Sequence, residues 1–122
     1  MRSEAEREPR QECCGLLAGR DSAITAIYPA ANGAANPATS YELAPRDLFR
    51  IMREIRAAKL ELLGIYHSHP DCDAYFSETD LKNSCPWYSF VVLSIRNGAF
   101  DHANSWLPDA EQTKAEREEL TY

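Results

Sequence analysis

The segment LLGIYHSHP, residues 62–70, predicts the strand around which the rest of this chain is arranged. We interpret residues 62–68 as a central β-strand and Pro70 as the residue that stops it. Because alternate side chains of a strand lie on one face, His67 and His69 can both point at one metal ion. Neutral imidazole nitrogen binds zinc at about 2.0–2.1 Å, so the two histidines are candidate zinc ligands at the mouth of the strand.

Strand and helix patterns continue on both sides of this segment. The clearest helix is residues 45–59, where Pro45 suits the first position and apolar residues recur at helical spacing. The pair Asn97-Gly98 favours a type I′ turn between two strands. The other expected elements are strands at 13–18, 24–29, 88–95 and 99–106, a brief strand at 41–43, a short helix at 77–83, and loops at 30–39 and 71–76. An order that mixes hairpins with a helical crossover predicts an α/β fold, a mixed β-sheet sandwiched by helices.

The two ends of the chain are less regular. Residues 1–10 are expected to form a short helical remnant or a frayed arm, and Pro9 ends any helix there. Beyond Pro108 the charge density rises, and helix, edge strand and disorder all remain open. A chain of 122 residues is long enough for one compact domain and too short for two, so we expect residues 1–122 to form a single domain.

The composition is that of an acidic globular protein. Hydrophobic residues make up 44% and charged residues 26%, which argues against global disorder. The formal net charge is -6, and an acidic surface repels phosphate backbones, so we expect no nucleic-acid partner. No apolar run approaches the roughly 20 residues that span a bilayer, and residues 1–11 lack the apolar middle of a signal peptide. We therefore expect no membrane partner and a cytoplasmic protein whose four cysteines are free thiols.

A hydroxyl and a carboxylate follow in the segment Ser77-Glu78-Thr79-Asp80. A helix that begins at Ser77 would carry Asp80 one turn inside it, where its carboxylate can complete a site of two histidines and one aspartate. Three protein ligands leave one position for water, which is typical of catalytic zinc, and zinc lowers the pKa of that water to about 7. Ser77 is then available to donate a hydrogen bond to a developing oxyanion.

Glu12 is the candidate proton acceptor. It begins the first apolar strand, where a carboxylate beside apolar surface has a raised proton affinity and can carry a proton from water to a leaving amine. Taken alone, Glu12 is only a charged strand end, and His67-x-His69 can be two ordinary strand histidines. Ser77-x-x-Asp80 alone is a capping box with Ser77 as the N-cap. Their combination in this order favours the catalytic interpretation.

This combination resembles the JAMM family, also called the MPN-plus metalloproteases. The family pattern is an upstream Glu, then His-[Ser/Thr]-His-Pro, then a Ser after seven intervening residues and an Asp three positions later. The chain matches it without a gap through Glu12, His67-Ser68-His69-Pro70, Ser77 and Asp80. A second segment is similar to the bacterial Mov34/MPN/PAD-1 branch in its residues Asn32, Pro37, Tyr41, Glu42 and Pro45. The resemblance covers roughly residues 11–97, most of the chain.

The resemblance implies a cytidine-deaminase-like α/β fold with one zinc ion per chain. It implies His67, His69 and Asp80 as the metal ligands, Glu12 as the acid/base and Ser77 as the stabiliser of the transition state. Family members hydrolyse peptide or isopeptide bonds next to the C-terminal Gly-Gly of ubiquitin-like proteins. Bacterial members act on small sulfur carriers of that fold, so such a carrier or its conjugate is the expected partner.

Two departures and two rival classes remain. Relatives usually carry a strand and a longer helix before the Glu strand, so a truncated N-terminal helix is one interpretation of residues 1–10. Cys72, in the loop after His69, is either an incidental thiol or a redox-sensitive fourth ligand. A zinc deaminase would need His-x-Glu and Pro-Cys-x-x-Cys, and neither His67-x-His69 nor Cys85 supplies them. A non-catalytic MPN scaffold would lack the metal ligands, which this chain retains.

Overall fold

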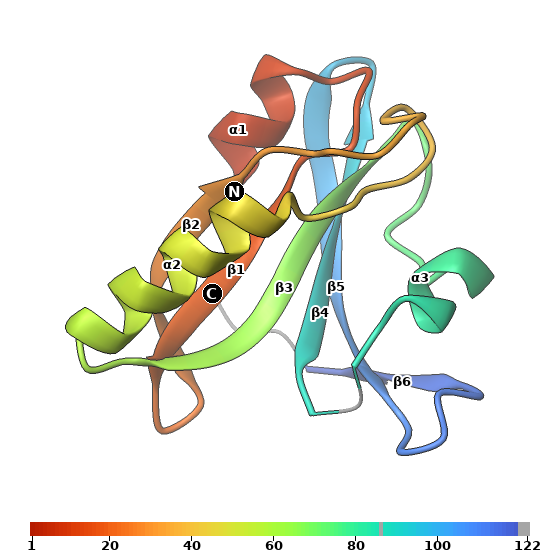
Figure 1. The fold of residues 1–122 in the computed structure, drawn as a ribbon. Helices are drawn as coiled ribbons and strands as arrows, with labels where there is room; N and C mark the ends of the chain where they lie inside the picture. The colour runs from red at the N-terminus through yellow and green to blue at the C-terminus, as the bar shows by residue number, and fades with distance from the viewer. Residues whose placement is uncertain (86, 120–122) are drawn as a thin grey trace.

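Six strands form one mixed sheet, and helices pack on both of its faces (Figure 1). The computed structural model describes residues 1–85 and 87–119. The order of strands across the sheet is β2-β1-β3-β4-β5-β6. Along the chain the elements are α1 (Arg2–Arg7), β1 (Cys14–Arg20), β2 (Ala23–Ala30), α2 (Pro45–Ala57), β3 (Glu61–Pro70), α3 (Glu78–Lys82), β4 (Ser89–Arg96), β5 (Ala99–Pro108) and β6 (Ala115–Glu118). The predicted α/β fold with a helix-covered mixed sheet is confirmed.

β3 is an interior strand of the sheet. It pairs with β1 antiparallel and with β4 parallel, and the parallel pairing requires the crossover that contains α3. The residues from Gly64 to His69 are all buried, as expected for a strand that is covered on both faces. β3 ends at Pro70, so the predicted strand and its stop are confirmed.

α2 covers the face of the sheet that is nearer the viewer in Figure 1. The helix begins at Pro45, whose missing N–H costs nothing at the first helical position. Ile51 and Ile55 are buried against residues of β1, β3 and β4, among them Leu16 and Phe90. This apolar packing is what holds the predicted helix on the sheet.

α1 packs on the opposite face. There the buried ring of Tyr66 lies in a second apolar cluster with Leu17, Val91 and Leu93. The Tyr66 hydroxyl donates a hydrogen bond to Glu4 Oε1 at 2.6 Å, and Glu6 Oε2 accepts from the backbone N–H of Phe100 at 2.8 Å. These two polar contacts tie the short helix to β3 and β5.

The hairpin turn between β4 and β5 has the predicted type I′ character. Both central residues are left-handed, with φ of 52° at Asn97 and 80° at Gly98, and Asn and Gly tolerate this conformation best.

Past Pro108, where helix, edge strand and disorder were all open, the structure has the edge strand β6. The highest-numbered residues, 120–122, lie outside the described part of the chain.

The brief strand predicted at residues 41–43 is wrong. Its only ladder contact is an isolated bridge between Asn32 and Leu43. Asn32 Oδ1 accepts hydrogen bonds from the backbone N–H groups of Ala34 and Glu42, at 3.0 and 3.1 Å. A side chain therefore takes the place of strand pairing in this loop, which a residue-by-residue strand propensity does not register.

Within the described part of the chain, each helix is too short or too polar to cross a bilayer.

Candidate active site

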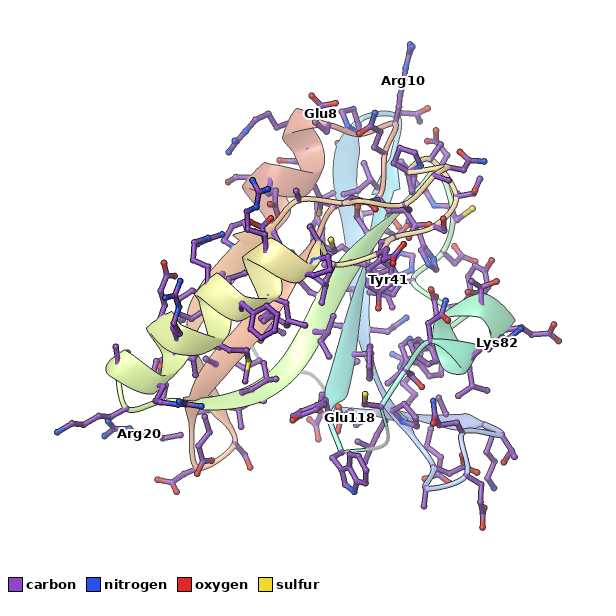
Figure 2. All side chains as sticks on the ribbon, viewed as in Figure 1. Glu8, Arg10, Arg20, Tyr41, Lys82 and Glu118 are labelled. Carbon is purple, nitrogen blue, oxygen red and sulfur yellow. The ribbon has the colours of Figure 1, made fainter. Side chains whose placement is uncertain are left out.

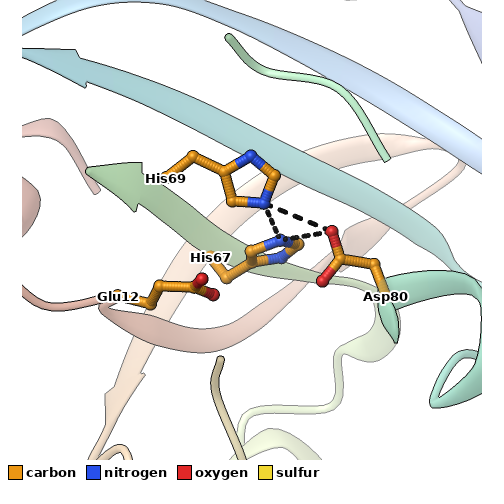
Figure 3. Close-up of side chains that lie close together, drawn as sticks. All are labelled: Glu12, His67, His69 and Asp80. Atoms are coloured by element: carbon orange, nitrogen blue, oxygen red, sulfur yellow. Dashed lines mark hydrogen bonds and ion pairs between the residues drawn. The ribbon is translucent and has the colours of Figure 1, made fainter. Parts of the chain in front are cut away.

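Four titratable side chains from three segments converge near the carboxyl end of β3 (Figure 3). Glu12 lies two residues before the start of β1, His67 and His69 lie in β3, and Asp80 lies in α3. One ligand atom of each residue lies within 4.8 Å of those of the others, and all four residues are buried. The structure thus brings together four of the five predicted site residues, and the fifth, Ser77, caps the helix that carries Asp80.

Strand pairing places Glu12 beside the histidines. In the β1–β3 ladder Cys14 lies opposite His67, and the N–H of Ser68 donates to the carbonyl of Cys13 at 3.0 Å. If this antiparallel register is continued from the pair of Cys14 and His67, residue 13 comes opposite residue 68 and residue 12 comes opposite residue 69. The carboxylate of Glu12 therefore reaches the cluster from a position 55 residues away in sequence from His67.

The loop between β2 and α2 holds the backbone of Glu12. The N–H of Glu12 donates to the carbonyl of Pro37 at 2.7 Å, and the carbonyl of Glu12 accepts from Asn32 Nδ2 at 2.8 Å. The same Asn32 amide also donates to the carbonyl of Ser40 at 3.0 Å. Asn32 is therefore a positioning residue to which sequence reasoning assigned no role, although it belongs to the segment that resembles the bacterial branch.

Ser77 and Asp80 form the capping box that the sequence left as an alternative. Ser77 Oγ accepts from the N–H of Asp80 at 3.0 Å, and Asp80 Oδ2 accepts from the N–H of Ser77 at 3.1 Å. The same Oδ2 atom lies 3.2 Å from Nε2 of both His67 and His69. The cap therefore fixes the carboxylate in the orientation that faces the histidines.

A backbone contact sets the tautomer of His69. Nδ1 lies 3.0 Å from the carbonyl of Asp73, an atom that only accepts, so Nδ1 carries a proton. In a neutral ring Nε2 then presents a lone pair, and this lone pair faces the Asp80 carboxylate. Two acceptors at 3.2 Å need a positive charge between them, either a proton on the imidazole or a metal ion.

The donor set fits a metal ion in composition and in size. The three distances among His67 Nε2, His69 Nε2 and Asp80 Oδ2 are 3.1, 3.2 and 3.2 Å. Ligands at about 2.0–2.1 Å from a tetrahedral ion are separated by about 3.3 Å, close to these edges. Glu12 Oε1 is buried with no hydrogen-bond partner within the described residues. A buried group of His, Asp and Glu side chains that can hold a metal is therefore present.

Burial and neighbouring charges shift the pKa values of the two carboxyl groups, Glu12 and Asp80, in opposite directions. Burial raises the pKa of Glu12 to about 7, a shift that His69 opposes and the Asp80 charge reinforces. Burial also acts to raise the pKa of Asp80, but hydrogen bonds from His67 and His69 outweigh it and hold this pKa below its ordinary value. Burial lowers the pKa of His67. Around neutral pH, Asp80 is thus the fixed anion of the cluster and Glu12 is the carboxyl that can exchange a proton.

Two tyrosines pack on the histidine rings. Tyr41 stacks on His67 with ring centroids 4.3 Å apart and an interplanar angle of 19°, and Tyr75 lies 5.0 Å from His69. Neither ring was assigned a role from the sequence. Tyr41 lies in the loop before α2 and Tyr75 in the loop after β3, and their contact with the histidines depends on the paths of these loops.

The loop of Tyr75 is anchored through Ala74. Its N–H donates to His102 Nε2 at 3.1 Å, and its carbonyl accepts from Asn104 Nδ2 and Trp106 Nε1 at 3.1 and 3.0 Å. This anchoring also keeps the carbonyl of Asp73 in place under His69. Cys72, the predicted optional fourth ligand, is exposed and is not one of the four converging residues.

The family comparison and the sequence comparisons agree. Residues 1–108 match the family described as prokaryotic homologues of the JAB domain. The chain is 36% identical over 110 residues to a desampylase of Haloferax volcanii, an alignment that covers 88% of this chain and 78% of that protein. It is 35% identical to a probable TtuB-protein conjugate cleaving protease of Thermus thermophilus, over 78% of this chain and 66% of that one. It is 32% identical to a CysO-cysteine peptidase of Mycobacterium tuberculosis, over 80% and 68% of the two chains.

The fold has a close counterpart among solved structures. The solution structure of a protein from Desulfitobacterium hafniense superposes with a TM-score of 0.80 at 25% identity, and the match covers 98% of this chain and 86% of that one.

Proposed function

This chain belongs to the family of prokaryotic JAB-domain homologues, and we propose that it is a zinc metallopeptidase that cleaves at the C-terminal Gly-Gly of a ubiquitin-like sulfur carrier. The bond is a peptide or isopeptide bond between the carrier and its conjugate. The names of three relatives, a desampylase, a TtuB-protein conjugate cleaving protease and a CysO-cysteine peptidase, support this class of substrate.

His67, His69 and Asp80 are the proposed zinc ligands. The observation that carries the assignment is the convergence of two imidazole Nε2 atoms and one carboxylate oxygen within 3.1–3.2 Å of one another. The carbonyl of Asp73 orients His69, and the Ser77 cap orients Asp80, as supporting contacts commonly do for metal ligands. Zinc held by these ligands would polarise the scissile carbonyl and lower the pKa of a water to about 7.

Glu12 is the proposed acid/base. Its Oε1 is buried and free of hydrogen bonds within the described residues, and its pKa of about 7 suits an exchange of protons near neutrality. In this role Glu12 takes a proton from the attacking water and delivers it to the leaving amine. Asn32 and Pro37 hold the Glu12 backbone, so the carboxyl needs no rearrangement to act.

Ser77 is the proposed donor to the developing oxyanion. Its Oγ acts as an acceptor in the cap, which leaves the hydroxyl hydrogen free to point elsewhere. Capping and oxyanion stabilisation are therefore compatible in one side chain. The contribution expected of one such donor is about 10²–10³ in kcat.

Metal content tests the ligand assignment. We expect purified wild-type protein to bind about one zinc per chain, and His67→Ala or His69→Ala to lose most of it, because two protein ligands seldom hold zinc tightly. Glu116→Ala is the control, since this exposed carboxylate of β6 lies outside the cluster and should leave the zinc in place. A wild-type protein without zinc would favour the scaffold alternative, and unchanged zinc in both ligand variants would refute the assignment.

Cleavage is tested with defined carrier substrates. CysO carrying a C-terminal cysteine and a TtuB-protein conjugate are incubated with the zinc-loaded enzyme, and intact mass reports release of the carrier ending in Gly-Gly. Loss of turnover in His69→Ala and in Glu12→Gln is the expected control. Absence of cleavage of both substrates by a zinc-loaded enzyme would argue against the proposed substrate class.

A further inference from the structure

An apolar groove runs between α2 and α3 on the face of the sheet that carries the site. Its volume is about 1030 Å³. The floor is formed by side chains of β1, β3 and β4, including Leu16, Ile65 and Phe90. Leu48, Phe49 and Met52 of α2 line one side, and Thr79 of α3 and Asn83, which follows α3, are among the residues that line the other.

The groove is continuous with the candidate active site. Tyr41, which stacks on His67, is one of its lining residues, and Figure 2 shows this ring between α2 and α3. Thr79, the residue before Asp80, lines it as well. A molecule held in the groove would therefore lie directly beside the metal-binding side chains.

The α2 side of the groove exposes apolar surface. Phe49 is 74% exposed and Leu48 is 37% exposed, although both belong to a helix whose Ile51 and Ile55 are fully packed. Exposed apolar side chains that line a concave surface are typical of a docking site.

Two arginine side chains lie beside this apolar surface. Arg53 and Arg56 line the groove, and neither forms an ion pair within the described residues. Arg50, on the same helix, is paired with Asp47 and Glu54 at 3.5 and 3.3 Å. One wall of the groove thus carries two arginines that have no ion-pair partner within the described residues, in a chain whose net charge is -6.

We infer that the groove beside α2 docks the carrier protein, and that it selects a carrier whose exposed apolar side chains are flanked by carboxylates. This inference rests on the proposed function for the identity of the partner. Apolar side chains of the carrier would fill the space next to Phe49 and Leu48, and its carboxylates would pair with Arg53 and Arg56. Such charge complementarity mainly governs encounter rate and the exclusion of wrong partners.

A second copy of this chain is a poorer occupant. In a two-fold contact through α2, the same patch lies on both subunits, so Arg53 and Arg56 of one copy would approach those of the other. Like charges across an interface are repulsive, whereas an acidic partner neutralises them.

Peptide binding tests the surface without any catalysis. Two labelled peptides share the same leucine and phenylalanine positions, and one carries Glu and the other Lys at the remaining positions. We expect wild-type protein to bind the Glu peptide at least about tenfold more tightly, since two charge pairs of about 0.5–1 kcal/mol each amount to roughly this factor. Arg53→Glu/Arg56→Glu should abolish this preference, and Phe49→Ser should weaken binding of both peptides.

A matched control carries the same change of charge elsewhere. Arg7→Glu/Arg117→Glu alters two exposed arginines on α1 and β6, which do not line the groove, and should retain the preference. Equal binding of the two peptides by wild-type protein, a preference that survives Arg53→Glu/Arg56→Glu, or no binding at all would overturn the inference. A wild-type dimer in sedimentation that Arg53→Glu/Arg56→Glu dissociates would overturn it in favour of a second copy.

A kinetic split connects the groove to turnover. With the carrier substrate that wild type cleaves, Arg53→Glu/Arg56→Glu should raise KM about tenfold with kcat nearly unchanged, because rim charges act mainly on association. Turnover of a short peptide ending in Gly-Gly-aminomethylcoumarin and the zinc content should stay as in wild type. An unchanged KM for the carrier contradicts the inference, whereas a zinc-loaded wild type that cleaves no carrier contradicts the proposed function and leaves the peptide result to decide on the surface.

Discussion

At the scale of single residues, Asp80 Oδ2 takes part in two arrangements at once. It accepts the Ser77 N–H that closes the helix cap, and it faces both histidine Nε2 atoms. From sequence, capping and metal binding look like competing explanations of Ser-x-x-Asp. In the structure the carboxylate oxygen that closes the cap is also the one that faces the histidines, so the two explanations are compatible.

The observed cap and the proposed oxyanion role of Ser77 predict different effects for two substitutions. Ser77→Ala removes the cap acceptor and the hydroxyl donor, so we expect a loss of about 0.5–2 kcal/mol in stability and about 10²–10³ in kcat. Ser77→Asp keeps a good cap but cannot donate when ionised, so it should melt near wild type and be as inactive as Ser77→Ala. Melting curves, zinc content and turnover on the same samples check this. Full activity of folded Ser77→Ala would leave Ser77 as a cap only.

Glu12→Gln separates metal binding from turnover. The amide keeps the shape of the side chain but cannot accept a proton, so we expect zinc content near wild type and turnover reduced to background. Near-normal kcat in this variant would assign the base to another group.

Glu12→Gln should also change how the stability of the zinc-free protein depends on pH. The pKa of Glu12 is about 7 in the folded chain against 4.5 for the ordinary carboxyl, so folding takes up a proton between these values. Stability therefore falls as pH rises through this window and levels off above 7, by up to about 3 kcal/mol in total. In chelator, Glu12→Gln should remove this fall and be the more stable protein at pH 8. Urea unfolding of both proteins at pH 5 and pH 8 measures this loss of stability. An equal loss between the two pH values in wild type and Glu12→Gln would contradict the prediction.

At the scale of elements, the close pairing of β1 with its neighbours positions Glu12. Gly15 permits it, because a Cβ there would lie 2.5 Å from the carbonyl oxygen of Tyr28 and from the ring of Tyr66. We expect Gly15→Ala to lower the free energy of unfolding by about 1–3 kcal/mol through overpacking. Gly33→Ala is the matched control, since its Cβ would meet only the carbonyl of Glu42 at 3.6 Å. Equal free energies of unfolding for Gly15→Ala and Gly33→Ala in urea would contradict the expected overpacking around β1.

At the scale of the whole molecule, the two faces of the sheet carry different tasks. The candidate metal-binding cluster and α2 lie on one face, and α1 and the Tyr66 cluster lie on the other. His67 and Tyr66 are neighbours in β3 and point to opposite faces. Changes behind the sheet should therefore alter stability without altering the site.

Tyr66→Phe tests this separation. It removes the partly buried hydrogen bond to Glu4, and a hydrogen bond to a charged group contributes about 1.5–3 kcal/mol. We expect a loss of stability of this order in urea unfolding, with unchanged zinc content. Tyr28→Phe is the control, because the Tyr28 hydroxyl makes no side-chain hydrogen bond within the described residues. A loss of zinc in folded Tyr66→Phe would mean that the two faces are coupled.

The sequence by itself determined the parts of this protein that depend on near neighbours. The alternation of β3 places His67 and His69 on one face, Pro45 starts α2, Asn97-Gly98 turns the hairpin, and Ser77 caps α3. Periods of 2 and 3.6 residues and local side-chain bonds carry this information, and they act within a few residues.

Only the tertiary structure decided what lies around the cluster. Glu12 lies near His69 because β1 and β3 pair Cys14 with His67, and Tyr41 stacks on His67 because Asn32 closes the preceding loop by hydrogen bonds. The apolar groove lies beside α2 because this helix buries Ile51 and Ile55 against the sheet and leaves Phe49 exposed. These contacts join residues far apart in the chain, and their geometry follows from packing and register, which no local pattern encodes.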